Sequence, residues 1–346
     1  MIDHPANGRP SRRDFIRLMT ASGAALCLGS LRGRAATGAR PQSPGPATPD
    51  FAYQYRSISI GRLGEVKEWF EKLDKDGKLS RQPIFRKYIG SFDYAPPKDL
   101  PRAKSLIIVS LPDWISAVTF HDRGISRNLL IPCGYVDFGI TEKMVKERVA
   151  ADILKDPAAG LVPAYGVPMK TLAARSGLAT YGKNNISYVE GYGSCNSLYA
   201  FYTDKGLPDQ WGPMRMLRFC KGCQICSAVC PTKAVRYDEF VIDAGKCLSL
   251  YNERKEPMPS WIDPAAHHTL AGCLRCQEKC PANREGLRNI KKLADISEQE
   301  TGLLLGGGSD PALRASIAKK LERFPSAGNF DYLSRNFRLA WANAVR

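Results

Sequence analysis

The sequence of 346 residues lacks an apolar stretch long enough to cross a membrane. A transmembrane helix needs about 20 mainly apolar residues, whereas the mildly apolar stretch from Leu18 to Leu31 has only 14. Runs of five or more basic residues are also absent, and no stripe of Lys and Arg is interleaved with aromatic residues. These absences argue against a membrane-spanning protein and against nucleic acid as a partner.

Apart from two runs of cysteines, the sequence has no internal repeat. Hydrophobic residues make up 44% of the chain, enough for a sizeable core. The formal net charge is +16, and residues 1–40 contribute +5 of it through seven arginines against two acidic residues. Such a balance suits nucleic acid, an anionic membrane or an acidic redox partner, but the even spread favours a generally basic surface.

The cysteines are the residues that most clearly indicate a chemical function for this sequence. Residues 220–231 read C-x2-C-x2-C-x3-C-P, and a second run from Cys273 to Pro281 lacks its first cysteine, which Cys247 can supply. This pattern wraps 4Fe–4S clusters, and the last cysteine of each run binds the other cluster. We therefore predict two 4Fe–4S clusters with two ligand sets. The first set is Cys220, Cys223, Cys226 and Cys280, and the second is Cys230, Cys247, Cys273 and Cys276.

Zinc and disulfides are weaker alternatives for these cysteines, because zinc sites usually use two C-x2-C pairs without the proline ending. Three further cysteines remain, Cys27, Cys133 and Cys195. The last two are interpreted mainly as small buried apolar residues. The neighbouring His267 and His268 are interpreted as loop or packing residues.

The N-terminus resembles a targeting segment. Residues 11–17, SRRDFIR, match the twin-arginine pattern and precede the apolar stretch. This pattern predicts export by the twin-arginine translocation machinery, with a periplasmic or membrane-associated location. That route carries folded proteins, which suits a protein whose clusters are inserted inside the cell. The alternative is a cytosolic amphipathic helix.

The remaining chain predicts an α/β (α+β) core, then a ferredoxin-like double-cluster domain, then C-terminal helices. Helical spacing appears from Gly64 to Leu73 and from Ile140 to Leu154, and a buried strand is expected from Lys104 to Leu111. The segments 185–189 and 197–202 suggest a hairpin. Two helices are expected at 312–324 and 331–345. The domain boundaries expected are 1–40 (signal), 41–55 (linker), 56–212 (core), 213–290 (clusters) and 291–346 (helices).

A family resemblance appears where the core meets the clusters. Residues 168–185, PMKTLAARSGLATYGKNN, combine a helix, a Gly-Lys-Asn turn and a strand, and the cysteine module follows. This combination resembles the epoxyqueuosine reductase and reductive dehalogenase families, as does the late segment YLSRNF at 332–337. The resemblance covers roughly residues 100–346.

The resemblance implies a nitroreductase-like core that holds a cobalamin, reduced by the two clusters in series. On this basis Tyr181, Lys183 and Asn184 are candidate cofactor-binding residues. Epoxyqueuosine reductases carry Asp-Tyr-His before their long helix, whereas this chain has Tyr135-Val-Asp137-Phe and no histidine. Asp137 and Tyr135 are the candidate catalytic proton donors. The alternatives are a helix N-cap for Asp137 and a packed aromatic for Tyr135.

The sequence thus predicts an exported iron–sulfur oxidoreductase that performs reductive chemistry on a small-molecule substrate. Its electrons would come from a donor protein or a quinone-linked complex. The tRNA substrate of the epoxyqueuosine reductases is not expected, because an exported protein would not meet tRNA. The alternative from another class is a ferredoxin-type electron carrier without catalysis, serving a membrane or periplasmic redox partner.

Overall fold

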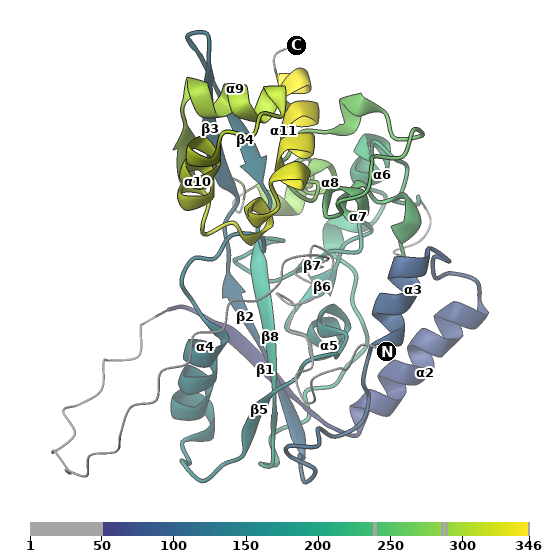
Figure 1. Ribbon diagram of the computed structural model, residues 1–346. Coiled ribbons are helices and arrows are strands. Elements are labelled where there is room, and N and C mark those ends of the chain that lie inside the picture. Colours follow the sequence, from purple (N-terminus) through teal and green to yellow (C-terminus); the bar gives the residue numbers. More distant parts are fainter. Residues whose placement is uncertain (1–50, 238–240, 285–286, 288–289, 345–346) are drawn as a thin grey trace, which may run out of the picture.

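The computed structural model describes residues 51–237, 241–284, 287 and 290–344 (Figure 1). The predicted signal segment and Cys27 lie outside the described residues. The lower part of the molecule is built on a four-stranded sheet in the order β1-β2-β8-β5. Its strands are β1 (Gln54–Ser59), β2 (Ser105–Pro112), β8 (Asn196–Thr203) and β5 (Leu161–Pro163), and all neighbours are antiparallel.

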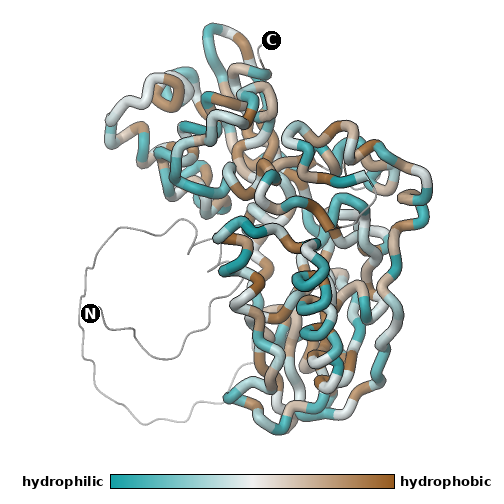
Figure 2. Tube along the Cα trace, turned by 90° about the vertical axis from the view of Figure 1, so that its right-hand side faces the viewer, coloured by the Kyte–Doolittle hydropathy of each residue, from teal (hydrophilic) through white to brown (hydrophobic). Residues whose placement is uncertain are grey.

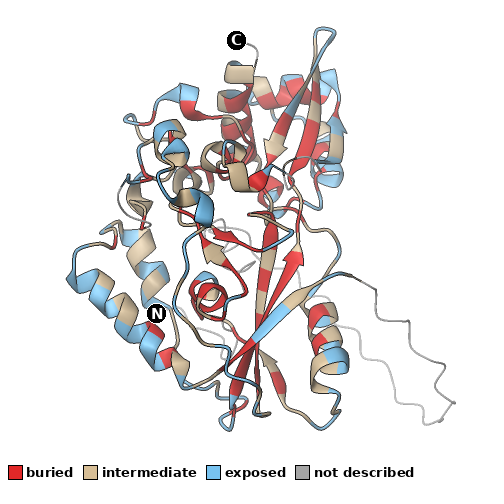
Figure 3. Ribbon diagram, turned by 180° about the vertical axis from the view of Figure 1, so that it is seen from behind, coloured by how far each residue is buried: buried red, intermediate tan, exposed pale blue. Residues whose placement is uncertain are grey.

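Strand β2 is central because its side chains are apolar on both faces. Ile107 and Val109 pack on one side against α4 (Glu142–Val149), and Leu106 and Ile108 pack on the other. That second face is covered by α5 (Met169–Arg175) and by the outer helix α2 (Arg62–Lys75). The predicted strand and helices are therefore confirmed, and α4 continues as a π turn over Ala150–Leu154. Figure 3 shows the buried residues gathered in these central strands and in α5.

The upper part of the molecule is a second lobe around a three-stranded sheet, β4-β3-β9. Strands β3 (Ser116–Asp122) and β4 (Ile125–Ile131) form a hairpin, and β9 (Lys291–Ile296) pairs in parallel with β3. The helices α9 (Glu298–Gly306), α10 (Pro311–Lys320) and α11 (Phe330–Ala344) cover this sheet. The C-terminus lies at the top of this lobe in Figures 1 and 2.

The expectation that the chain is purely helical after the last cluster cysteine is wrong, because β9 intervenes. Its sequence, KKLADI, alternates too weakly to predict a strand. Pairing with β3 supplies the hydrogen bonds that form it, and that partner lies far away in the chain. The C-terminal helices share one core with the β3–β4 hairpin, where the rings of Phe120 and Phe337 lie 4.5 Å apart between centroids.

The hairpin expected between residues 185–189 and 197–202 is also corrected. Strand β7 (Ser187–Tyr188) pairs with β6 (Thr180–Tyr181), and β8 pairs with β2 in the main sheet. The intervening turn does form, since the N–H of Val189 donates to the carbonyl of Gly193. The eight-residue apolar β2 offers β8 a longer ladder than the two-residue β7 can.

The cysteine region forms a third part beside the upper lobe (Figure 1). It contains only short helices, α6 (Ile225–Val229), α7 (Leu248–Asn252) and α8 (Arg275–Glu278), joined by loops and 3-10 turns. Among the described residues, helices are all too short or too polar to serve as membrane spans.

Candidate functional site

The first predicted cysteine set surrounds a small cavity. Cys220, Cys223, Cys226 and Cys280 line it, although Cys280 comes from the second run of the sequence. Phe219 and Ile225 also line this cavity, and both side chains are exposed to solvent on its outer side. The structure thus brings together the ligand set predicted from spacing and places it near the surface.

The second predicted set gathers deeper in the molecule. Cys230, Cys247 and Cys276 pack in one apolar cluster, and Cys273 lies beside them. Burial raises the pKa of Cys273 to about 12, and burial together with the neighbouring cysteines raises that of Cys276 well above its ordinary value. Deprotonating these buried thiols therefore costs free energy unless a positive charge lies nearby, and the irons of a cluster supply that charge. The chemistry of these buried thiols fits a 4Fe–4S cluster.

The Gly-Lys-Asn turn fastens both cysteine runs to the core. The ammonium of Lys183 donates to the carbonyl of Cys223 at 3.1 Å. The amide nitrogen of Asn184 donates to the carbonyl of Cys276 at 3.3 Å and to the hydroxyl of Tyr188 at 2.9 Å. Tyr181 is buried against Thr171, away from both cavities. The three candidate cofactor-binding residues therefore lie at or behind the cluster loops and do not line the larger cavity described next.

Replacing Asn184 with alanine is expected to lower the free energy of unfolding by about 1–3 kcal/mol, because the buried Tyr188 hydroxyl and the Cys276 carbonyl both lose the hydrogen bond that Asn184 donates. The loss of cluster absorbance under chelator should also become faster. Anaerobic thermal unfolding checks the first effect. Asn128→Ala, on the exposed side of β4, is the matched control. Equal effects of the two substitutions would show that Asn184 does not hold the loops.

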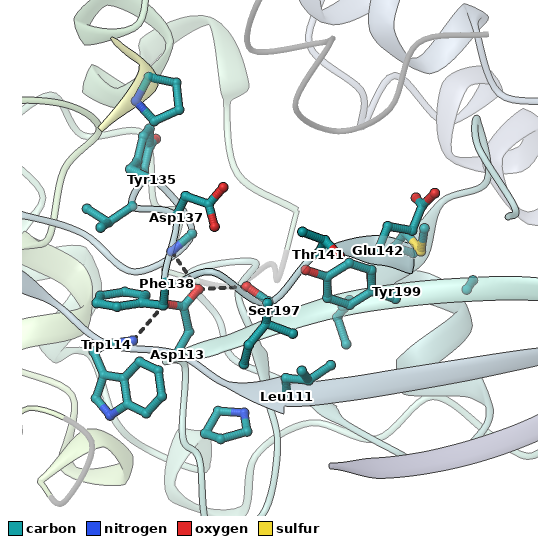
Figure 4. Close-up of a pocket in the computed structure, with 18 of the residues that line it drawn as sticks. Leu111, Asp113, Trp114, Tyr135, Asp137, Phe138, Thr141, Glu142, Ser197 and Tyr199 are labelled. Atoms are coloured by element: carbon teal, nitrogen blue, oxygen red, sulfur yellow. Dashed lines mark hydrogen bonds between the residues drawn. The ribbon is translucent and has the colours of Figure 1, made fainter. Parts of the chain in front are cut away.

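A larger cavity of about 480 Å³ opens between the main sheet and the upper lobe (Figure 4). The end of β2, the middle of β8 and the segment 134–143 form its walls, and Pro325 and Ser326 close one side. Its lining is mixed, with the aromatic residues Trp114 and Phe138, whose rings pack edge-to-face at 5.0 Å, beside carboxyl and hydroxyl groups. This is a space suited to a sizeable cofactor or substrate group.

Asp113 is the central polar residue of this cavity, and sequence analysis missed it. Its carboxylate is nearly buried and accepts hydrogen bonds from the backbone of Trp114 at 2.7 Å and of Gly134 at 2.9 Å, and from the hydroxyl of Ser197 at 2.6 Å (Figure 4). It thereby fastens the segment 134–139 to strand β8. The available signal was an acidic residue directly after a buried apolar strand.

Asp137 lines the same cavity, and its interpretation as a helix N-cap is wrong. Thr141 caps α4, since its hydroxyl accepts from the backbone of Met144 at 3.2 Å. The Asp137 carboxylate accepts instead from the backbone N–H of Gly139 at 2.8 Å. Its own backbone is held by Arg323, with one hydrogen bond of 2.7 Å in each direction. The loop that Arg323 holds therefore places the side chain at the cavity wall (Figure 4).

Tyr135 links this cavity to the second cysteine set. Its hydroxyl donates to the carboxylate of Glu253, and burial next to that carboxylate raises its pKa well above the ordinary value. Gly272 has a φ of +56°, and a Cβ there would approach the Tyr135 hydroxyl to 2.6 Å, so only glycine fits. Cys247 is among the charged neighbours of Tyr135. Gly272 directly precedes Cys273, so the cavity wall reaches the loop that carries the deeper cysteine set.

The remaining cysteines and histidines singled out in the sequence are packing residues. Cys195 is buried against Ile115 and Leu274, and Cys133 packs beside it, which confirms both as apolar packing residues. His268 accepts from the backbone of Leu274 at 3.1 Å, and burial lowers its pKa to about 4. His267 is also buried with a lowered pKa of about 4. In the described part of the chain, no three Cys, His, Asp or Glu side chains are spaced to hold a single metal ion.

Comparison with known proteins supports the cluster assignment. Residues 219–283 match the family model described as a 4Fe-4S double cluster binding domain. Epoxyqueuosine reductase from Synechocystis is 33% identical over 117 residues, which cover 33% of this chain and 39% of that protein. The enzyme from Bacillus cereus is 24% identical over 247 residues, covering 66% and 62%. The matched regions thus span between about two fifths and three fifths of these two relatives.

Solved structures with the same fold are also epoxyqueuosine reductases. The structure from Streptococcus thermophilus has a TM-score of 0.58 and 18% identity, covering 84% of this chain and 77% of that one. A Bacillus subtilis structure with its catalytic loop swung out of the active site has a TM-score of 0.57 and 18% identity over the same shares. These likenesses establish a mixed α/β fold with a 4Fe–4S domain in its C-terminal part. The nitroreductase-like core stays a prediction.

One expectation about partners is overturned. An epoxyqueuosine reductase with a TM-score of 0.59 and 18% identity, covering 84% of this chain and 77% of its own, was solved with an epoxyqueuosine-modified tRNA stem loop. The argument against nucleic acid was therefore wrong. It relied on the absence of long basic runs, but a folded surface gathers basic residues that are separated in sequence.

Proposed function

We propose that this chain is an iron–sulfur reductase in which two 4Fe–4S clusters pass single electrons to a redox group in the larger cavity. The contact of Tyr135 with Glu253, beside Cys247, is the observation that carries this proposal. Tyr135 also packs against Gly272, the residue before Cys273, which supports a short distance between the cavity wall and the deeper cysteine set. The first set lies nearer the surface. Electrons would therefore enter at the first cluster and leave from the second.

The redox group we propose is a corrinoid, in line with the sequence resemblance. The cavity supports this choice through its place between the main sheet and the upper lobe and through its mixed lining, with the aromatic residues Trp114 and Phe138 beside the polar groups of Glu142 and Tyr199. A bound corrinoid would supply a strongly reducing metal centre next to the substrate. The residues of this chain would hold it against the sheet and keep water away. Asp113 would position the wall through its bonds to Gly134 and Ser197.

We propose Asp137 as the proton donor of the reaction. Reductive removal of a carbon–oxygen bond needs protons as well as electrons, and the donor must lie at the reacting centre. Asp137 lines the cavity on a loop that Arg323 holds. Tyr135 is less suited, because its hydroxyl is engaged by Glu253.

The substrate class we propose is a modified nucleoside within nucleic acid. The support is the structural relative solved with a modified tRNA stem loop, together with the basic balance of residues 41–346, which carry +11 of the +16 net charge. This replaces the small-molecule substrate expected from the sequence.

The test is an anaerobic preparation of the whole chain, assayed for iron, sulfide, corrinoid uptake and turnover. About eight irons and eight sulfides per chain are expected from two cubane clusters. Added cobalamin should be retained on gel filtration, and the reduced holoprotein should convert an epoxyqueuosine-modified tRNA stem loop. Full cluster content without corrinoid uptake or turnover would indicate the electron carrier instead. Bound zinc without sulfide would overturn the cluster assignment as well.

We also propose that residues 1–40 act as a twin-arginine export signal. Replacing Arg12 and Arg13 together with lysine is expected to retain the protein in the cytoplasm with its clusters intact, because the translocation machinery recognises the arginine pair. Cell fractionation followed by cluster spectroscopy measures the outcome. Equal export of both forms would contradict the signal assignment. The export signal and the nucleic-acid substrate exclude each other, because an exported chain does not meet tRNA. Fractionation that finds all of the unaltered chain outside the cytoplasm would overturn the substrate class, and fractionation that finds it all inside would overturn the export signal.

A further inference from the structure

The surface around the first cysteine set carries exposed basic side chains together with large exposed apolar ones. From Pro213 to Tyr237 the sequence contains five Arg and Lys residues and no Asp or Glu, and the run ends at Asp238. All five basic residues are exposed. Phe219 is 59% exposed and Tyr237 is 55% exposed, although such large apolar side chains are usually covered.

These apolar residues lie directly over the first cluster position. Phe219 and Ile225 line the cavity of the first cysteine set and are also exposed to solvent, so they form its outer wall. The ring of Tyr237 lies 5.3 Å from the ammonium of Lys183, which itself lines that cavity. The three side chains therefore belong to one continuous patch. An exposed apolar patch with a charged rim is typical of a protein-binding site.

We propose that a small acidic electron-transfer protein docks on this entry face, made of Arg215, Arg218, Phe219, Lys221, Ile225 and Tyr237, and reduces the first cluster through it. The inference rests on the proposed function, since it names the electron donor of that reductase. In each docking event one electron passes from the reduced donor to the first 4Fe–4S cluster. The donor is oxidised by one electron, the cluster is reduced by one, and no bond is broken.

Charge complementarity identifies the occupant. The entry face carries three positive residues, Arg215, Arg218 and Lys221, and no negative one, so it attracts a partner of negative charge and steers it during diffusion. The exposed rings exclude water at the centre, where a thin wall separates the partner from the cluster. Electron-transfer encounters bury little surface, under about 1,200 Å², so a patch of this size is sufficient. Basic side chains with exposed rings also suit nucleic acid, but only an electron donor needs them directly over the first cysteine set.

The entry face is also separate from the substrate side. The first-set cavity and the larger cavity share no lining residue. A donor on the entry face and a substrate in the larger cavity can therefore bind at the same time. The electron path then runs from the entry face through both clusters to the cavity.

The test compares two reductants of the cluster-loaded protein in stopped flow. The probes are an acidic plant-type ferredoxin, chemically reduced beforehand, and dithionite. Arg218→Glu combined with Lys221→Glu is expected to slow reduction by ferredoxin at least about tenfold at low salt, the lower end of the range for electrostatic steering. Reduction by dithionite should not change. Raising the salt to 1 M should lower the ferredoxin rate of the unaltered protein towards that of the variant, because salt screens the charges.

Three controls separate the outcomes. Lys75→Glu combined with Lys319→Glu makes the same charge change on exposed helical positions elsewhere and should leave the ferredoxin rate within about twofold. Arg218→Gln combined with Lys221→Gln should give an intermediate loss. Iron content and cluster spectra must be equal in all forms.

If the Arg218/Lys221 variants keep the ferredoxin rate of the unaltered protein, the entry face is not the docking site of the donor. Reduction by dithionite would still support the proposed reductase in that case. Loss of tRNA stem-loop binding with an unchanged ferredoxin rate would assign the face to nucleic acid instead. Failure of both reductants in the unaltered protein would overturn the proposed function itself.

Discussion

Replacing Cys276 with serine is expected to halve the iron content to about four per chain and to reduce turnover to the uncatalysed background. The substitution removes a thiolate from the deeper set, which lies next to the larger cavity. Serine keeps the shape but its hydroxyl does not ionise as a ligand thiol does. The first cluster should still accept electrons and have no route to the cavity. Iron analysis, low-temperature electron paramagnetic resonance and turnover measure the effect.

Cys223→Ser offers the complementary result, since Cys223 belongs to the outer set. It should also lose about four irons, but from the cluster nearer the surface. Cys133→Ser is the matched control, because this half-buried cysteine belongs to neither set. Full iron content and turnover are expected there. Retention of both clusters in Cys276→Ser would contradict the ligand assignment.

Asp137→Asn is expected to lower turnover by about a hundredfold or more, the scale on which general acids act. Asparagine keeps the hydrogen bond from Gly139 through its amide oxygen and leaves the backbone clamp by Arg323 in place. The proton is lost and the loop should stay where it is. Turnover per loaded molecule, the melting temperature and the pH profile are the measurements.

Two further variants distinguish the roles around this loop. Asp295→Asn, at an exposed position of strand β9, is the control for removing a carboxylate and should not affect turnover. Tyr135→Phe removes the hydrogen bond to Glu253 and tests whether this link matters for the rate. If Asp137→Asn lowers only the melting temperature and leaves the rate per folded molecule intact, Asp137 is structural. An unchanged rate in both Asp137→Asn and Tyr135→Phe would remove the segment from the reacting centre.

The features that sequence alone determined are local or repeat at fixed spacing. The cysteine spacings divided the ligands into two sets. In agreement with that division, Cys220 and Cys280 line the same cavity in the structure. The apolar run of β2 identified a strand buried on both faces. Asp310 and Pro311 marked the start of α10, where the Asp310 carboxylate caps the first turn. Each of these signals acts between neighbouring residues, so no distant partner is needed to recognise it.

Only the tertiary structure decided the features that depend on distant partners. Strand β9 forms because β3 lies beside it, and Asp113 becomes a site residue because Gly134 and Ser197 converge on its carboxylate. Lys183 turns from a cofactor candidate into a support for the cluster loop because Cys223 lies within reach. The physical reason is common to all three. A hydrogen bond or a ladder between residues far apart in sequence exists only after the chain has folded, and no spacing along the sequence encodes it.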